Sequence, residues 1–323
     1  MPDAITLGEL LIDFVPTLSG VSLVEAPAFV KAAGGAPANV AVGLARLGVS
    51  SGFMGKVGDD AFGRFLARTL AEASVDVSCL RFTTQARTGL SFMSLRADGE
   101  RDFLFYRHPS ADMLYTPEEV DAGAAYLRQA KALHFGSISL IGEPSRSATL
   151  RAVQVAHEAG LLISYDPNLR LDLWPEADER AARAGIMLGW TRAGVIKLNE
   201  EELIFLSGKE DWVSGARSLW HPGLRLLVVT RGKEGCAYVT TEFSGEVPGF
   251  EAATIDTTGA GDGFVAGLLK GLLQHPGAMD NEVMLRSICR YANAVGALTT
   301  TERGAIPALP DLVRVSEFSE NSP

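Results

Sequence analysis

The heptapeptide DTTGAGD at residues 256–262 says more about this chain than any other stretch. Residues 251–255 (EAATI) before it are predicted to form a strand. Apolar residues after it recur at helical spacing, namely Phe264, Val265, Leu268, Leu269, Leu272 and Leu273. The glycines are therefore predicted to lie where a strand passes into a helix. Backbone N–H groups at such a helix start are unpaired and partly positive, so they can hold phosphate oxygens.

Single residues of this heptapeptide have distinct predicted tasks. Gly259 and Gly261 can adopt positive φ and let a ligand approach the backbone closely. Asp262 falls in the first helical turn, where it could take a proton from an attacking hydroxyl group. Glycine-rich turns before helices are also common without a ligand, and such an aspartate can merely complement the helix dipole. The motif alone leaves both interpretations open.

The composition is that of an ordinary globular protein, with 323 residues of which 47% are hydrophobic and 21% charged. The formal net charge of −10 disfavours partners such as nucleic acid or an anionic membrane, which need clustered Lys and Arg. Cys79, Cys236 and Cys289 lie far apart, so we expect reduced, buried thiols. The first residues lack the basic region of a signal peptide and carry Asp3 and Glu9 instead. No apolar run reaches about 18 residues, so we expect a cytoplasmic protein.

Strands and helices are predicted to alternate along most of the chain. Runs typical of buried strands occur at residues 5–7, 53–57, 133–135, 162–165, 195–198 and 226–230. Helical patterns lie between several of them, at residues 39–47, 62–72, 145–158 and 177–187. We therefore expect a single α/β domain over residues 1–323, with a mostly parallel sheet covered on both faces and a loose tail at residues 316–323.

Two segments, about residues 10–33 and 88–108, break this alternation and are predicted to be extended. The second contains ADGE at residues 97–100, a good hairpin turn between alternating strands. Together the segments predict a small sheet that is separate from the main one. Its exposed face and edges would need cover, by a substrate beneath it or by a partner subunit.

A second glycine motif is GGAPANVAVGLARLG at residues 34–48. Gly34 and Gly35 allow a small ligand to approach the backbone, and Pro37 suits a first helical position. Asn39 offers both a hydrogen-bond donor and an acceptor. This chemistry suits a polyol, although a tight turn entering an amphipathic helix would explain the pattern equally well.

Polar residues follow the predicted strand at residues 162–165. Asp166 and Arg170, in YDPNLR, should face the crevice at the carboxyl ends of the strands. A guanidinium group matches phosphate oxygens with a fork of donors, so Arg170 could bind a hydroxyl or the transferred phosphoryl group. The alternative for Arg170 is a surface salt bridge.

Two further strands also end in polar sequences. Asn199 and Glu202 are three residues apart on an incipient helix, where they could hold a hydrated magnesium ion or merely cap the helix. Thr230, Gly232 and Gly235 belong to a polar glycine turn fit for phosphate or ribose, although a lone GxxG is a weak signal.

Over nearly its whole length the chain resembles the ribokinase-like sugar kinases, also called the PfkB family. Gly34, Gly35 and Asn39 match the amino-terminal glycine motif of that family, and DTTGAGD matches its carboxy-terminal signature. Asn199 with Glu202 resembles the N-x-x-E element, and VGDDAFG at residues 57–63 resembles the GxDxFG stretch. Walker A and protein-kinase HRD sequences are absent from the chain.

The resemblance implies a ribokinase-like three-layer αβα sandwich with a mostly parallel central sheet and a small β-sheet lid made by the two extended segments. It implies an ATP-dependent phosphotransferase with an alcohol group as acceptor, which uses Mg²⁺ and, in many members, K⁺. The partners it implies are a small sugar and ATP, together with a second copy of the chain bound through the lid.

The resemblance also implies roles for single residues. Asp262 would be the general base, and the turn of Thr258, Gly259, Ala260 and Gly261 would form an anion hole. The implied sugar contacts are Asp13, Gly34, Gly35, Asn39, Arg107 and Arg170. The implied ATP contacts are Asn199, Thr230, Gly232, Gly235 and, at the adenine, Asn293. Glu202 would bind magnesium through water. Asp256 and Thr258, with the loop at residues 299–304, match where many members bind potassium.

The wording GGAPAN, with YDPNLR followed by Leu173, Trp174 and Pro175, most resembles fructokinases, which convert ATP and D-fructose to ADP and D-fructose 6-phosphate. A 2-keto-3-deoxygluconate kinase, a ribokinase and an aminoimidazole riboside kinase are alternatives. A sugar acid would need cationic recognition, which Arg107 and Arg170 could provide. A catalytically idle sugar-binding regulator is the alternative outside enzymes, but it would be expected to lack Asp262 or the glycines before it.

Overall fold

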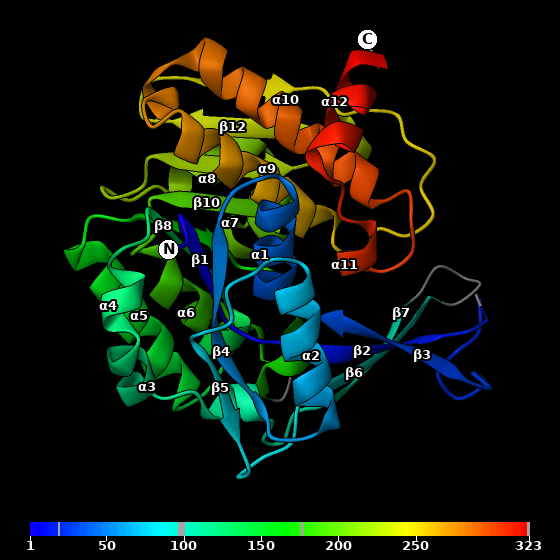
Figure 1. Ribbon diagram of the computed structural model, residues 1–323. Helices are drawn as coiled ribbons and strands as arrows, with labels where there is room; N and C mark the ends of the chain where they lie inside the picture. Colours follow the sequence, from blue (N-terminus) through cyan, green and yellow to red (C-terminus); the bar gives the residue numbers. More distant parts are fainter. Residues whose placement is uncertain (19, 96–100, 176–177, 322–323) are drawn as a thin grey trace.

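The computed structural model describes residues 1–18, 20–95, 101–175 and 178–321 (Figure 1). Within these ranges the main sheet has nine strands in the order β13-β12-β11-β10-β9-β8-β1-β4-β5. Its strands are β1 (Ala4–Leu7), β4 (Ser51–Gly58), β5 (Leu80–Thr83), β8 (Ala132–Gly136), β9 (Leu162–Asp166), β10 (Val195–Asn199), β11 (Leu226–Thr230), β12 (Cys236–Thr240) and β13 (Ser244–Val247). Each of the six strands predicted at residues 5–7 to 226–230 is present.

The sheet is parallel from β5 to β11, and β12 and β13 are antiparallel at one edge. Every residue of β1, β4 and β8 is buried. Such continuous burial is expected where helices cover both faces of a parallel sheet, and it explains why these strands are mostly apolar.

Helices cover the two faces of the sheet in separate groups (Figure 1). One group packs around Phe264, Leu268 and Leu298 and contains α1 (Ala36–Arg46), α9 (Ala260–Gln274), α10 (Glu282–Thr299) and α12 (Leu312–Asn321). The other packs around Phe135 and Trp190 and contains α3 (Pro117–Ala122), α4 (Ala124–Leu127), α5 (Ser145–Glu158), α6 (Glu179–Trp190), α7 (Glu200–Ser207) and α8 (Trp212–Ser218). The result is a helix–sheet–helix sandwich.

The predicted small sheet is present and projects from the side of the molecule (Figure 1). In the described part of the chain it has four strands in the order β3-β2-β6-β7, namely β2 (Leu11–Pro16), β3 (Phe29–Gly34), β6 (Leu90–Leu95) and β7 (Arg101–Tyr106). β6 and β7 pair antiparallel, whereas the hairpin turn predicted at residues 97–100 lies outside the described residues. After β1 the chain enters the small sheet as β2, and it leaves the small sheet through β3, which leads into α1.

The two faces of the small sheet differ. Phe14, Phe92 and Leu104 are register partners on the outer face, where Phe14 meets Phe62 of α2 (Ala61–Glu72). Asp13 and its register partner Ser91 belong to the opposite face, because side chains alternate along a strand. Asp13 is thereby directed back toward the main sheet.

Two sequence predictions are wrong. Residues 251–255 form no strand; they are mostly exposed, Ile255 is 61% exposed, and its N–H bonds the carbonyl of Thr300. Because this segment has no apolar face to bury, it runs beside the end of α10 instead of joining the sheet. The tail expected at residues 316–323 is helical as far as Asn321 in α12, because Phe318 packs on Phe250. The helix predicted at residues 177–187 begins at Glu179, and residue 177 lies outside the described residues.

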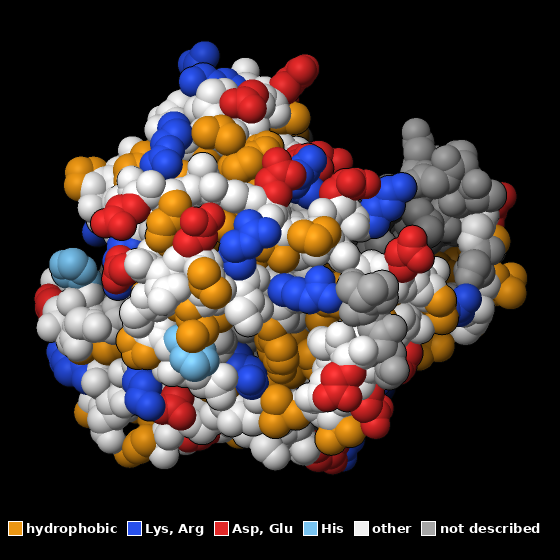
Figure 2. All heavy atoms as spheres, turned by 90° about the horizontal axis from the view of Figure 1, so that it is seen from above, with side chains coloured by type: hydrophobic (Ala, Val, Ile, Leu, Met, Phe, Trp, Pro, Cys, Tyr) orange, Lys and Arg blue, Asp and Glu red, His pale blue; other side chains and the backbone are white. Residues whose placement is uncertain are grey.

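The surface and the thiols agree with the composition. On the face shown in Figure 2, Lys and Arg side chains are interspersed with Asp and Glu. Cys79, Cys236 and Cys289 are buried and free. In the part of the chain that the structure describes, no helix is both long and apolar enough to cross a membrane.

Candidate active site

The carboxyl ends of the parallel strands place the predicted polar residues along one edge of the main sheet. Asp166, Asn199 and Thr230 are the last residues of β9, β10 and β11. The amino ends of α1 and α9 reach the same edge, because Asn39 of α1 contacts Asp262 of α9. A site at this edge is what an open parallel sheet favours.

The start of α9 is shaped by two glycines. Gly259 is the N-cap with φ of 80°, and a Cβ there would lie 2.7 Å from the Cβ of Ala305. A Cβ on Gly261 would lie 2.9 Å from Nζ of Lys197. The N–H of Gly261 belongs to the first turn, whose donors have no carbonyl four residues earlier within the helix. The N–H of Ala260 donates to the carbonyl of Thr257 at 3.3 Å. Donors and a cation therefore converge on the turn that was predicted as an anion hole.

Asp262 is held by Asn39. Asn39 Nδ2 donates a hydrogen bond of 2.8 Å to Oδ2 of Asp262, which joins the two glycine motifs directly. Burial raises the pKa of Asp262 to about 6, while the bond from Asn39 and the charges of Lys197 and Arg170 act to lower it. Asn39 Oδ1 is buried and has no partner among the described residues, so it remains available to accept a hydrogen bond from a ligand hydroxyl.

Lys197 is a site residue that the sequence predictions missed. Its Nζ lies 2.9 Å from Oδ2 of Asp166, and both side chains are buried. Burial alone would lower the pKa of Lys197, but Asp166 and Glu202 raise it, so the ammonium group stays charged. A lysine within the otherwise apolar strand VIKLN was the signal, since lysine is almost never fully buried without a partner.

Asp13 lies against the second glycine motif. A side chain at Gly34 would overlap its carboxylate, and a side chain at Gly35, where φ is 111°, would overlap the carbonyl oxygen of Glu9. Burial raises the pKa of Asp13 to about 7; Arg170 lowers it and Asp262 raises it. The structure thus brings Asp13, Gly34, Asn39 and Asp262 together, as the motif matches predicted.

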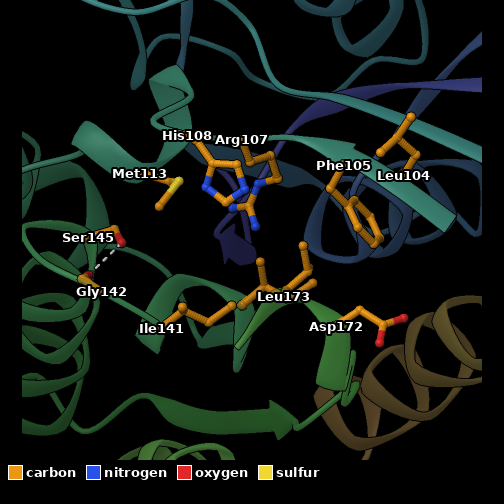
Figure 3. Close-up of a pocket in the computed structure, with 11 residues that line it drawn as sticks. Leu104, Phe105, Arg107, His108, Met113, Ile141, Gly142, Ser145, Asp172 and Leu173 are labelled. Carbon is orange, nitrogen blue, oxygen red and sulfur yellow. Dashed lines mark hydrogen bonds between the residues drawn. The ribbon is translucent and has the colours of Figure 1, made fainter. Parts of the chain in front are cut away.

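The two predicted substrate arginines have different surroundings. Arg170 is exposed, and its charge acts on the pKa of both Asp13 and Asp262. Arg107 is 4% exposed and forms a buried ion pair with Asp112. It also lines a cavity of about 260 Å³ beneath β7 (Figure 3). Neither Asp112 nor the pairing of Arg107 was predicted from the sequence.

Asn199 and Glu202 form a capping box at the start of α7. Asn199 Oδ1 accepts from the N–H of Glu202 at 2.7 Å, and Glu202 Oε2 accepts from the N–H of Asn199 at 2.9 Å. Glu202 Oε1 also accepts from the N–H of Leu169 at 2.7 Å. Asn199 and Glu202 therefore cap the helix, which is one of the two roles predicted for them. Each carboxylate oxygen of Glu202 keeps one lone pair that can accept from a water molecule.

Direct metal ligands are scarce in this region. The residues that the structure describes contain no cluster of three or more His, Cys, Asp or Glu side chains able to hold a metal ion.

The turn between β11 and β12 contains two glycines with different surroundings. Gly232, with φ of 54°, faces open space, whereas a side chain at Gly235 would overlap the carbonyl of Val247. Asn293 Nδ2 donates to the carbonyls of Val247 and Pro248 at 3.1 and 3.0 Å. Both amide hydrogens of Asn293 thus fix this segment, and its Oδ1 remains the group that could contact a base.

Asp256 joins the two loops that were predicted to bind potassium. Its Oδ1 accepts from the N–H and hydroxyl of Thr258 at 2.9 and 2.7 Å, and its Oδ2 accepts from the N–H of Gly304 at 2.9 Å. The carboxylate holds the approach to α9 against the loop at residues 299–304. This contact fixes the position of the glycine turn.

A fold and a site of this kind define the ribokinase-like phosphotransferases: a parallel sheet, a carboxylate at a glycine-turn helix start, and a polar glycine motif facing it. The pattern of the pfkB family carbohydrate kinases matches residues 1–312, and the chain belongs to this family. The predicted fold class is confirmed by the solved structures that it resembles.

Several relatives of the chain are named as fructokinases. Probable fructokinase-7 of Arabidopsis thaliana is 55% identical over 317 residues, which cover 97% of this chain and 91% of that protein. The structure of a fructokinase from Xylella fastidiosa with bound ATP gives a TM-score of 0.90 at 35% identity, covering 99% of each chain. A fructokinase from Vibrio cholerae O395 with bound fructose, ADP and calcium gives 0.87 at 35% identity, covering 98% of each chain.

Proposed function

We propose that this chain is a fructokinase, which transfers the γ-phosphoryl group of ATP to D-fructose and forms ADP and D-fructose 6-phosphate. The observation that carries this proposal is the hydrogen bond between Asn39 and Asp262. It fixes a polyol-binding motif directly against a carboxylate at a phosphate-binding turn. The relatives with 50–55% identity named as fructokinases support fructose as the sugar.

Asp262 acts as the general base in this proposal. A pKa of about 6 leaves the carboxylate ionised at neutral pH, yet makes it more basic than an ordinary aspartate. Asp13, Gly34, Gly35 and Asn39 hold the sugar so that its hydroxyl group faces Asp262. Holding the reactants in line supplies much of the rate in phosphoryl transfer, because the protein makes little covalent change.

The transferred phosphoryl group lies at the turn of Gly259, Ala260 and Gly261. The backbone donors of this turn, with Lys197 beneath Gly261 and the exposed Arg170, would stabilise negative charge on the phosphoryl oxygens. The buried pair of Lys197 with Asp166 keeps the ammonium group in place without making the site strongly cationic. The charges are therefore positioned before the reaction begins.

Asn199, Thr230, Gly232, Gly235 and Asn293 line the ATP side in this proposal, and Gly232 offers open space for the nucleotide. Mg²⁺, held by the phosphates and reached by Glu202 through water, would neutralise phosphate charge. K⁺ would bind beside Asp256 and Thr258, where it would fix the two loops that Asp256 already joins.

The small sheet is the lid in this proposal. Closure of residues 10–33 and 88–108 over the sugar would exclude water and limit hydrolysis of ATP. We further propose that two copies of the chain pair through this sheet. Val30 and Tyr106 are 59% and 58% exposed there, and β3 and β7 are its edge strands among the described residues. A cytoplasmic location would suit the three free thiols.

A coupled ADP-release assay tests the sugar. Fructose, 2-keto-3-deoxygluconate, ribose and adenosine would be compared under the same magnesium and potassium concentrations. We expect the highest kcat/KM with fructose. A higher kcat/KM with any of the other three acceptors would overturn the choice of sugar, whereas absence of ADP release with all four would overturn the kinase assignment for these acceptors.

A further inference from the structure

A buried group of three charged side chains lies at the base of the small sheet, and its two acids have no part in the chemistry described above. Arg107 follows β7, Asp112 belongs to the short helical turn η1 (Ala111–Leu114), and Glu9 lies between β1 and β2. They are 4%, 8% and 3% exposed. Glu9 accepts a hydrogen bond of 2.9 Å from the N–H of Ala36, so the group contacts the first residue of α1 directly.

This group contains one cation and two acids. Arg107 pairs with Asp112, whose other oxygen accepts from the hydroxyl of Ser110. Burial alone would lower the pKa of Arg107, but Asp112 and Glu9 raise it, so the guanidinium group remains charged. Because the two acids face the same guanidinium, its positive charge is offset before any ligand binds.

Arg107 nevertheless points into the cavity beneath β7 (Figure 3). The other walls of this cavity include the apolar side chains of Phe105, Ile138 and Leu173, together with the polar His108, Ser145 and Asp172. Arg107 Nε is buried and has no hydrogen-bond partner among the described residues. A buried unpaired donor favours a ligand that brings an acceptor, and a neutral hydroxyl group provides one without adding charge.

A carboxylate in the same position would meet different surroundings. It would gain attraction from Arg107 but would also be repelled by Asp112 and Glu9, the two buried acids whose charges act on that guanidinium group. It would also lose its hydration on entry. An arginine that the sequence suggested as a receptor for a sugar acid is therefore already neutralised by its own neighbours.

We propose that Asp112 determines the class of sugar accepted: by pairing with Arg107 it excludes sugar acids from the cavity beneath β7 and reserves that space for neutral sugars. This inference rests on the proposed function, because it concerns the substrate of the same site. Asp112 acts through Arg107 and is a positioning residue. Removal of its charge would leave Glu9 as the remaining acid of the group beside Arg107, so a carboxylate in the cavity would meet less repulsion.

The test compares kcat/KM for 2-keto-3-deoxygluconate with kcat/KM for fructose in the wild type and in Asp112→Asn. Asparagine keeps the shape, and Ser110 can accept a hydrogen bond as well as donate one. We expect the acid-to-fructose ratio to rise at least about tenfold, mainly through a lower KM for the acid. Asp121→Asn, which breaks the more exposed Asp121–Arg151 pair, is the matched control and should leave the ratio unchanged.

Loss of a buried partner can unfold a protein, so folding of Asp112→Asn would be checked by its thermal unfolding. If it does not fold, Glu9→Gln replaces it, because glutamine still accepts the bond from Ala36 and should move the ratio in the same direction. A ratio within about twofold of wild type in the folded variant overturns the inference. Wild type that prefers ribose to fructose would overturn only the proposed sugar, whereas wild type that prefers 2-keto-3-deoxygluconate would overturn both.

Discussion

Asp262 has neighbours with opposing effects on its proton affinity, and this balance suits a base. Burial raises its pKa, whereas Asn39, Lys197 and Arg170 lower it. We expect Asp262→Asn to reduce kcat by at least about 10²-fold, because general-base contributions are of that order. ATP binding, measured by isothermal titration calorimetry, should be largely retained.

Asp280→Asn is the matched control for that change. Asp280 is exposed, pairs with Arg225 on the surface, and should tolerate the same substitution without loss of turnover. Near-normal turnover in Asp262→Asn would show that another group accepts the proton.

The hydrogen bond from Asn39 predicts a shift in the pH profile. A base with a pKa of about 6 is inactive when protonated, so kcat/KM should fall as the pH drops through that value. Asn39→Leu removes a donor that favours the ionised carboxylate, and the pKa of Asp262 should therefore rise. The acidic limb of log kcat/KM against pH should move to higher pH, whatever the loss in sugar affinity. If the acidic limb of Asn39→Leu stayed at the wild-type pH, Asn39 would have no influence on the ionisation of Asp262.

The sequence predicted single residues best where a motif placed them. Asp262, Gly259 and Asn39 could be named because glycine turns and helix starts have local signatures. Lys197 and Asp112 could not, because their importance comes from partners distant in the chain or on a loop without a pattern. Burial and pairing of charges are properties of the assembled fold, and spacing along a chain does not reveal them.

The two glycines at the start of α9 have different predicted roles: Gly259 is needed for the fold, and Gly261 is needed for the approach of the ligand. At Gly259, φ of 80° and the Cβ of Ala305 at 2.7 Å both oppose a side chain. Gly259→Ala should therefore lower both the unfolding temperature and kcat. Gly261 lacks a positive φ, and its new methyl group would meet the end of the Lys197 side chain at 2.9 Å instead of backbone. Gly261→Ala should reduce kcat with little effect on the unfolding temperature.

Thermal unfolding and steady-state kinetics check both alanine variants. Gly277→Ala is the control, because a Cβ there meets nothing within 4 Å and φ is −87°. It should change neither property. If Gly261→Ala lost stability and activity to the same extent as Gly259→Ala, the distinction between the two glycines would be wrong.

Elements with a buried face were predicted well, and elements defined by irregular contacts were not. The six strands were recognised because burial on both faces makes such strands rich in apolar and β-branched residues. Residues 251–255 contain β-branched residues but pair with no strand among the described residues; the N–H of Thr254 bonds the carbonyl of Ala252, and the N–H of Ile255 bonds that of Thr300. Residues 316–321 look polar, yet Phe318 packs the end of α12 against Phe250. Local propensity is a weak guide where one tertiary contact decides.

The whole molecule assembles its site from residues far apart in the chain. Asn39 and Asp262 are separated by 223 positions, and they meet because α1 and α9 lie side by side on the same face of the sheet. Parallel topology places the starts of such helices at the same edge. The sequence could therefore predict that the two motifs face one crevice, whereas the hydrogen bond between them required the folded structure.

The small sheet leads to a prediction about assembly. Val30 lies on the edge strand β3 and is 59% exposed, and an apolar side chain on an open edge favours pairing with another chain. We expect the wild type to be a dimer by size-exclusion chromatography with light scattering. Val30→Glu should shift it toward the monomer, because a carboxylate buried at the interface would lose its hydration.

Val313→Glu provides the matched control for that substitution. Val313 lies on α12, away from the small sheet, and is 62% exposed, so the same charge is added to an equally accessible valine. It should leave the dimer intact. A wild type that is monomeric at micromolar concentration, or a Val30→Glu variant that stays dimeric, would contradict pairing through this sheet. If pairing also supports lid closure, Val30→Glu should raise the KM for the sugar more than the KM for ATP, since only the sugar lies beneath the lid.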